Sequence, residues 1–355
     1  MSRILTRYIG MTITTTILIV GLMVLGLVLL LGVVSELADV GQGDYTLIRA
    51  LLHVFMVAPI QFYQLFPIVG LIGGILGLGQ LASRSELTVM RAAGYSLLQI
   101  VVAVLKVGLL LVLIITVLGE TCAPWLAQKA TIDKQIAMSG GQALQTQTGL
   151  WLHGKNTITY IHEVLPGKHL QGVTRYEFNI DGNLISETSI DEAIYQNHHW
   201  LLNGVQQSLI GDQHIVTKHI PHMTTELVLY PDLFGITKLD PTAMGMIKLY
   251  KYIRFQEDND VTIVSFQFAL WQRLLQPLST AVMIFLAIPF VFGSLRTVTM
   301  GLRIVAGIIV GGSFYLLNQF LGPVSLVYQV PPALAASFPM VLFMIVGCFL
   351  LRRVR

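Results

Sequence analysis

The chain has 355 residues, of which 54% are apolar and only 12% are charged, about half the charge density of a typical soluble domain. This composition excludes an ordinary soluble globular protein. The 22 Lys plus Arg and 19 Asp plus Glu leave a net charge of +3, which is too small and too scattered for a nucleic-acid-binding surface. The sequence therefore predicts a membrane protein.

Six apolar segments are long enough to cross a membrane, which takes about 18 to 20 apolar residues at a helical rise of 1.5 Å each. The first is too long for the core of a signal peptide and is expected to remain as a membrane anchor. The six spans form two groups of three around a long insert. We expect them at 11–34, 54–80, 97–121, 274–292, 304–321 and 333–351.

Arginines indicate the orientation of these spans. In a six-span chain, nine of them fall on one side of the membrane, with Glu86 as the only acid among them. The positive-inside tendency predicts that this side is cytoplasmic and that both termini lie there. The nine are Arg3, Arg7, Arg84, Arg91, Arg296, Arg303, Arg352, Arg353 and Arg355.

The insert, at about 123–265, is expected to be a folded extracytoplasmic domain. It holds 14 acids and 10 Lys plus Arg, a net charge of −4. Short alternating runs are broken by turn dipeptides such as Asp181-Gly182 and Asn203-Gly204, which are typical of hairpins. We therefore predict an all-β, jelly-roll-like domain with helical connectors at 124–139 and 241–258. The predicted domains are 1–122 with the first three spans, 123–265 with the β domain and its connectors, and 266–355 with the last three spans.

The loop after the second span predicts a short amphipathic helix at about 82–94. A serine caps it and Gly94 ends it, while Leu87 and Met90 share one side and the charged residues face elsewhere. Two interpretations stay open: a solvated surface helix, or a docking element for a cytoplasmic partner.

Small residues in the second and fifth spans allow close approach of helix backbones. The pattern fits packing within one chain as well as a subunit interface. The residues concerned are Gly70, Gly73, Gly74, Gly77, Gly307 and Gly311.

Catalytic and metal-binding signatures are absent from the sequence. It has no Gly-x-x-x-x-Gly-Lys-Ser/Thr loop, so the chain does not cradle a nucleotide by itself. The His198-His199 and His219/His222 pairs lack the carboxylates of a metal site, and Cys122 and Cys348 are expected to be free. We therefore predict a chain that is no enzyme and binds no metal or cofactor of its own.

Three stretches carry a resemblance that extends over the whole chain. They are residues 83–94, the Gln276-Pro-Leu-Ser segment and residues 292–303. Together with the three-plus-three arrangement around a β domain, they resemble the permeases of the lipopolysaccharide-export ABC transporter, the LptF/LptG family. Residues 322–332 are similar to the G-type subunit rather than to its F-type partner.

The resemblance implies an inner-membrane protein of a Gram-negative bacterium that moves lipopolysaccharide. It implies a heterodimer with an F-type permease above a cytoplasmic ATPase dimer that binds the ATP and Mg. It also implies a bridge of jelly-roll domains made with a bitopic periplasmic protein and a soluble bridge protein. The loop helix would dock on the ATPase, and the matching residues are Arg84, Glu86, Met90, Arg91 and Gly94.

Two further sites follow from the resemblance. Spans one and five would form a lateral gate with the partner permease. The gate candidates are Leu27, Leu31, Gly307, Gly311, Phe314 and Tyr315. G-type members carry lysines at the outer end of span one, where this sequence has Ala38 and Asp39, so other cations must hold the lipid phosphates. The candidates are Lys134, Lys129, Arg49 and Arg273.

Two alternatives remain from the residues alone. One is a different ABC permease, and the other is a membrane-anchored assembly or sensor protein whose β domain binds periplasmic partners. Only the transport interpretation requires a stoichiometric ATPase.

Overall fold

The computed structural model describes residues 2–138, 150–153, 156–165, 169–196, 199–211, 214–225, 241–257, 264–292 and 298–353. Arg296, Arg355, His198 and residues 293–297 of the third family-like stretch lie outside this range. The chain forms two compact units. The first comprises 1–36, 54–127 and 264–355, and the second comprises 37–53 and 128–263.

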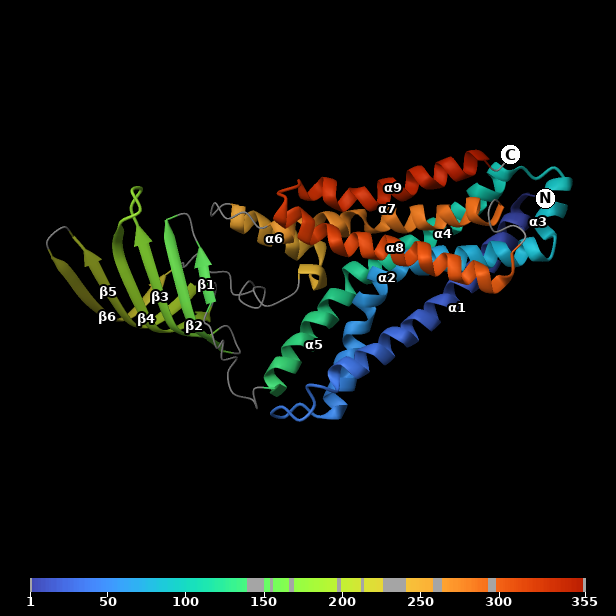
Figure 1. Cartoon of the computed structure of the whole chain (residues 1–355). Coiled ribbons are helices and arrows are strands. Elements are labelled where there is room, and N and C mark those ends of the chain that lie inside the picture. Colours follow the sequence, from blue (N-terminus) through green and yellow to red (C-terminus); the bar gives the residue numbers. More distant parts are fainter. Residues whose placement is uncertain are drawn as a thin grey trace. The chain divides into compact units, whose positions relative to one another are not determined.

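The first unit is built from long apolar helices (Figure 1). In the described part of the chain, six helical stretches are long and apolar enough to cross a membrane. The prediction of six spans around an inserted β domain is thus confirmed. The long helices are α1 (Ser2–Glu36), α2 (Leu47–Ser83), α4 (Leu97–Glu120), α7 (Val264–Phe292), α8 (Met300–Val327) and α9 (Pro332–Arg353).

Helix α2 lies at the centre of this unit and α1 at its periphery. The most apolar window of α2 is 72% buried, whereas that of α1 is 17% buried. Gly73 and Gly77 face α1: a Cβ at Gly73 would lie 2.6 Å from Cα of Ile17, and one at Gly77 would lie 2.6 Å from Oγ1 of Thr16. The same Thr16 hydroxyl donates to the Gly73 carbonyl at 2.9 Å. Glycine therefore lets α1 pack directly on the α2 backbone.

The other two glycines of α2 face α7. A Cβ at Gly70 would lie 2.8 Å from Ile284, and one at Gly74 would lie 2.9 Å from Ala287. The small residues of the second span thus serve packing within the chain, on two faces of one helix.

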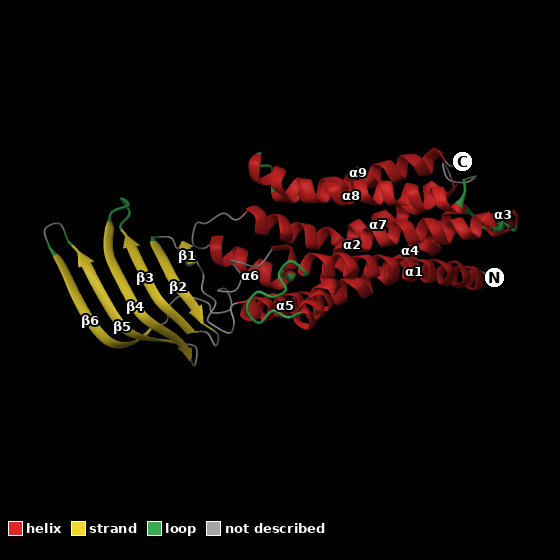
Figure 2. Ribbon diagram, turned by 60° about the horizontal axis from the view of Figure 1, so that its bottom comes forward, coloured by secondary structure: helices red, strands yellow, loops and turns green. Residues whose placement is uncertain are grey.

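The second unit contains a single antiparallel sheet (Figure 2). Its described strands pair in consecutive order, β1 to β6, so they form a meander. The strands are β1 (Leu150–His153), β2 (Thr157–Leu165), β3 (His169–Phe178), β4 (Leu184–Gln196), β5 (His199–Ile210) and β6 (Ile215–Thr225). The predicted Asp181-Gly182 turn joins β3 to β4, with Gly182 at φ 83°. Asn179 Oδ1 accepts hydrogen bonds from two backbone N–H groups of this turn.

The prediction of a turn at Asn203-Gly204 is wrong, because both residues lie inside β5. Gly204 has φ 64° and Gly172 in β3 has φ 67°. Residues three apart in a regular strand lie on opposite faces, yet here three such pairs are buried together. Two of the pairs flank Gly172 and Gly204, and the third lies in β4, between those two strands. The pairs are Leu170 with Val173, Ile190 with Ala193, and Leu202 with Val205. The positive φ therefore bends the sheet across its strands instead of reversing the chain.

Helical connectors flank the sheet, as predicted. They are α5 (Cys122–Met138) and α6 (Met246–Glu257), the latter preceded by a 3₁₀ turn at Pro241–Ala243. The short helix α3 (Glu86–Ala92) follows α2. Cys122 and Cys348 are both free.

Candidate functional site

Helix α3 is seated on the core of the first unit. Ser85 adopts a left-handed conformation at φ 59° and starts the helix. Gly94, at φ 85°, follows its end. Leu87 and Met90 are buried in the main apolar cluster. The sequence grouped Met90 with the residues of a docking surface, but the structure places its side chain inside the chain, where it anchors the helix.

Glu86 is held at the first turn of α3 by its own chain. Its Oε1 lies 4.0 Å from Nη1 of Arg84, and the Tyr8 hydroxyl interacts with the same carboxylate. Its Oε2 is buried and has no hydrogen-bond partner within the described residues. The Glu86 side chain as a whole is 25% exposed, so a bound partner would contact the exposed part of the carboxylate and not the buried Oε2.

The exposed side of α3 adds an apolar contact that the sequence reasoning missed. Val89 is 66% exposed, and Arg91 and Ala92 are exposed beside it. Helical spacing could have predicted this. Once Leu87 and Met90 are assigned to the core, Val89 falls on the outward face of the helix.

In the second unit, the predicted phosphate ligand Lys134 forms an ion pair. Its Nζ lies 2.7 Å from Oδ2 of Asp39 and 5.6 Å from the ring centre of Tyr45. The backbone N–H of Asp44 donates to the carbonyl of Ala137 at 2.8 Å. The α1–α2 loop is therefore fastened to α5 by charge and by backbone, a contact we term the loop clip (Asp39, Asp44, Tyr45, Lys134 and Ala137).

Two further contacts fix the same loop. A Cβ at Gly43 would lie 2.5 Å from the carbonyl oxygen of Met138, so only glycine permits this approach. Nδ1 of His53 lies 3.0 Å from the carbonyl oxygen of Ala130. The other two candidate cations of this unit, Lys129 and Arg49, have exposed side chains.

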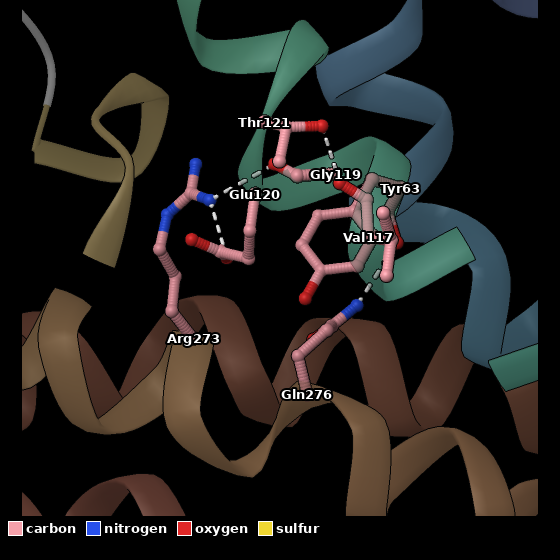
Figure 3. Close-up of polar contacts among 7 residues, drawn as sticks. All are labelled: Tyr63, Val117, Gly119, Glu120, Thr121, Arg273 and Gln276. Carbon is pink, nitrogen blue, oxygen red and sulfur yellow. Dashed lines mark hydrogen bonds and ion pairs between the residues drawn. The ribbon is translucent and has the colours of Figure 1, made fainter. Parts of the chain in front are cut away.

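Arg273, the fourth candidate for the lipid phosphates, lies in a buried ion pair (Figure 3). Its Nη1 donates to Oε1 of Glu120 at 2.8 Å. The two side chains are only 6% and 17% exposed. The guanidinium lies 6.0 Å from the ring centre of Tyr63. Arg273 therefore joins α7 to α4, and its side chain is only 6% exposed to a lipid phosphate.

Gln276 lies about one helical turn after Arg273 in α7, and it supplies a hydrogen bond that Pro67 removes from α2. Pro67 has no N–H, so the carbonyl of Tyr63, four residues earlier, loses its helical donor. Nε2 of Gln276 donates to this carbonyl at 3.0 Å and to the neighbouring carbonyl of Gln64 at 3.2 Å. The side chain reaches from α7 to the α2 backbone (Figure 3). Gln276 thus fixes the position of the proline kink.

The gate candidates of α8 divide between two faces. A Cβ at Gly307 would lie 3.1 Å from Ile72, and one at Gly311 would lie 2.7 Å from Ile68. Phe314 packs edge-on against Phe343 of α9 at 5.4 Å between ring centres. These three residues therefore contact α2 and α9 of the same chain, and their part in a gate between subunits stays a prediction.

The outward faces of α1 and α8 are free of such contacts. Leu27 and Leu31 of α1 are more than half exposed, as the gate hypothesis requires. Tyr315 of α8 is half-buried and accepts a hydrogen bond from Gln319 Nε2 at 2.9 Å. Between residues 304 and 320, the large exposed apolar residues of α8 are Ile304, Val305, Ile308, Ile309, Leu316 and Phe320.

A row of polar side chains crosses the sheet beside its bend. Glu192 contacts His169 Nε2 at 2.6 Å and accepts from Asn203 Nδ2 at 2.7 Å. Nδ1 of His222 lies 2.9 Å from Oδ1 of Asn203. The hydrogen bonds from Asn203 and His169 lower the pKa of Glu192. Within the described residues, no group of three His, Cys, Asp or Glu is placed to hold a metal.

Comparison with known proteins assigns the family. The family described as "Lipopolysaccharide export system permease LptF/LptG" matches residues 7–353. The chain is 37% identical to the lipopolysaccharide export system permease protein LptG of Escherichia coli K12 over 353 residues, 99% of this chain and 98% of that protein. It is 35% identical to LptG of Haemophilus influenzae over 353 residues, 99% of each. The chain therefore belongs to the LptF/LptG family of lipopolysaccharide export system permeases.

Proposed function

We propose that the chain is the G-type permease of an ABC transporter that extracts lipopolysaccharide from the inner membrane and passes it to a periplasmic bridge. Family membership over residues 7–353 carries this proposal. The architecture supports it, because the chain joins six membrane helices to a β domain. The subunit is non-catalytic, so ATP hydrolysis falls to a separate cytoplasmic ATPase that binds the ATP and Mg.

The proposed partners are an F-type permease, an ATPase dimer, a bitopic periplasmic jelly-roll protein and a soluble bridge protein. Docking on the ATPase is supported by the exposed face of α3 and by Glu86, whose side chain is 25% exposed. Assembly of the bridge is supported by β1 and β6, which end the described sheet, because edge strands accept a further strand.

The proposed orientation places both termini in the cytoplasm and the β domain in the periplasm. The arginine distribution supports it. Cysteines introduced singly at Ser83 and Asn183 test it, on a background with the native cysteines replaced. In intact spheroplasts, a membrane-impermeant thiol reagent should label the second and spare the first; labelling of Ser83 would contradict the orientation.

For the gate, we propose that Leu27 and Leu31 face the partner permease together with the exposed side of α8. The opposite face of α8 packs inside the chain through Gly307, Gly311 and Phe314. This packing supports a gate formed by the exposed face. For the lipid phosphates, Lys129 and Arg49 are exposed cations, and Lys134 would contribute once its pairing with Asp39 is exchanged for a phosphate.

Co-purification tests this function against the assembly or sensor alternative. The tagged chain should retain an ATPase in stoichiometric amount, and lipopolysaccharide should stimulate its hydrolysis. A chain that purifies with periplasmic β proteins but with no ATPase would contradict the transport function.

A further inference from the structure

The connector helix α6 has two faces of different chemistry. Its buried face consists of Leu249, Tyr252 and Ile253. Its exposed residues are Ile247, Lys248, Tyr250, Lys251, Arg254 and Glu257. Four of them, Ile247, Tyr250, Lys251 and Arg254, are here termed the α6 stripe. At 100° per residue, the four side chains of the stripe lie within an arc of about 100°. The helix is therefore amphipathic, with a narrow outward surface.

The α6 stripe combines cations with apolar surface. Ile247 is 74% exposed and Tyr250 is 51% exposed. The Arg254 guanidinium lies 5.7 Å from the ring centre of Tyr250 and donates from Nε to its hydroxyl at 3.1 Å. Basic, aromatic and aliphatic residues on one face are typical of helices that lie in the headgroup layer of a membrane.

The charge of this helix is opposite to that of its surroundings. Three of the 10 Lys plus Arg in residues 123–265 fall within 248–254, and α6 holds one acid, Glu257, at its last position. The same segment of 143 residues has a net charge of −4, from 14 acids and 10 cations. The stripe thus complements an anionic surface.

Chain connections keep α6 near the membrane. Seven peptide links join Glu257 to the start of α7 at Val264, so they reach at most about 25 Å. On its other side, Lys248 Nζ donates to Oε1 of Gln128 in α5. Gln128 lies eight residues after Glu120, the last residue of α4, which corresponds to no more than about 12 Å of helical rise. Two membrane helices therefore hold α6 within reach of the headgroups.

We propose that the α6 stripe docks on anionic phospholipid headgroups at the membrane surface where α4 ends and α7 begins. Lys251 and Arg254 bind the lipid phosphates, while Ile247 and Tyr250 enter the interfacial layer. The docked helix fixes the connector through which the sheet is attached to the bundle. This inference requires only that α4 and α7 cross a membrane, and it does not depend on which lipid is transported.

The test uses the full-length chain in nanodiscs of phosphatidylcholine, with or without phosphatidylglycerol. Cys122 and Cys348 are replaced by serine, and Ile247→Cys carries an environment-sensitive fluorophore. With phosphatidylglycerol, we expect blue-shifted emission, protection from an aqueous quencher, and loss of both at high salt. The same label in Ile180→Cys, which is 95% exposed in the β3–β4 turn, should respond to neither lipid nor salt.

Charge reversal makes the test specific. Each cation near an anionic surface changes partitioning roughly five-fold, so Lys251→Gln with Arg254→Gln should reduce docking on the order of 30-fold, and Lys251→Glu with Arg254→Glu should reduce it further. Lys251→Arg should retain docking, and Lys218→Glu in β6 should leave it unchanged. Equal emission in both lipid compositions, or an unaffected double variant, would overturn the proposal. Protection that occurs only after lipopolysaccharide is added would also overturn it, since the stripe would then bind the transported lipid.

Discussion

At the scale of single residues, Glu86 is the carboxylate on which coupling to the ATPase depends in this account. A charge-assisted contact contributes about 1.5–3 kcal/mol, and reversal of its sign replaces attraction by repulsion. Glu86→Lys should therefore reduce the amount of ATPase that co-purifies with the chain. Asp181→Lys in the exposed β3–β4 turn is the matched control and should retain it. Undiminished ATPase retention by Glu86→Lys would refute the role.

Asp39 and Lys134 provide a second prediction at this scale. Their side chains are 33% and 19% exposed, so the pair contributes no more than about 1 kcal/mol. The exchange Asp39→Lys with Lys134→Asp should restore the stability that Lys134→Asp alone removes, as measured by thermal unfolding of the purified protein.

If Lys134 also binds a lipid phosphate, Lys134→Glu should lower crosslinking of lipopolysaccharide to the chain, and Lys129→Glu should lower it less. Unchanged crosslinking in Lys134→Glu would show that Lys134 serves the loop clip and does not bind a lipid phosphate.

At the scale of secondary-structure elements, the kink of α2 depends on α7. Removal of the Gln276 amide leaves the buried carbonyl of Tyr63 without a donor, at a cost of about 1–3 kcal/mol. Gln276→Leu should lower the stability of the purified protein by this amount. Pro67→Ala supplies a backbone N–H again, so Gln276→Leu should cost less on that background. Additive effects of the two substitutions would show that the contact does not serve the kink.

The two faces of α8 make opposite predictions for the gate. Ile308→Cys lies on the exposed face, and Gly311→Cys lies on the face packed against α2. With a cysteine in the first span of the partner permease, the former should form a disulfide and block export, whereas the latter should form none. A crosslink from Gly311 instead would place the gate on the glycine face.

At the scale of the whole molecule, the sequence predicted what depends on local composition. The six spans follow from apolar length and the strands from alternation and turns. Contacts between distant residues could not be predicted in this way: Asp39 and Lys134 are 95 positions apart, and Gln276 and Tyr63 are 213 apart. Small-residue spacing indicates close helix packing but not the neighbouring helix, so it could not show that Gly307 and Gly311 contact α2 of the same chain. The Asn203-Gly204 dipeptide favours a positive φ, and a bend within a strand can contain a positive φ as readily as a turn. The sequence therefore could not distinguish the two.

Release of lipopolysaccharide from proteoliposomes tests the central claim most directly. The chain is reconstituted with an F-type permease and the ATPase, and transfer of lipid to the soluble bridge protein is followed by crosslinking. We predict ATP-dependent transfer that stops when this chain is omitted or when it carries Glu86→Lys. Transfer at an equal rate without the chain, or ATP hydrolysis without any transfer from the complete assembly, would contradict the account.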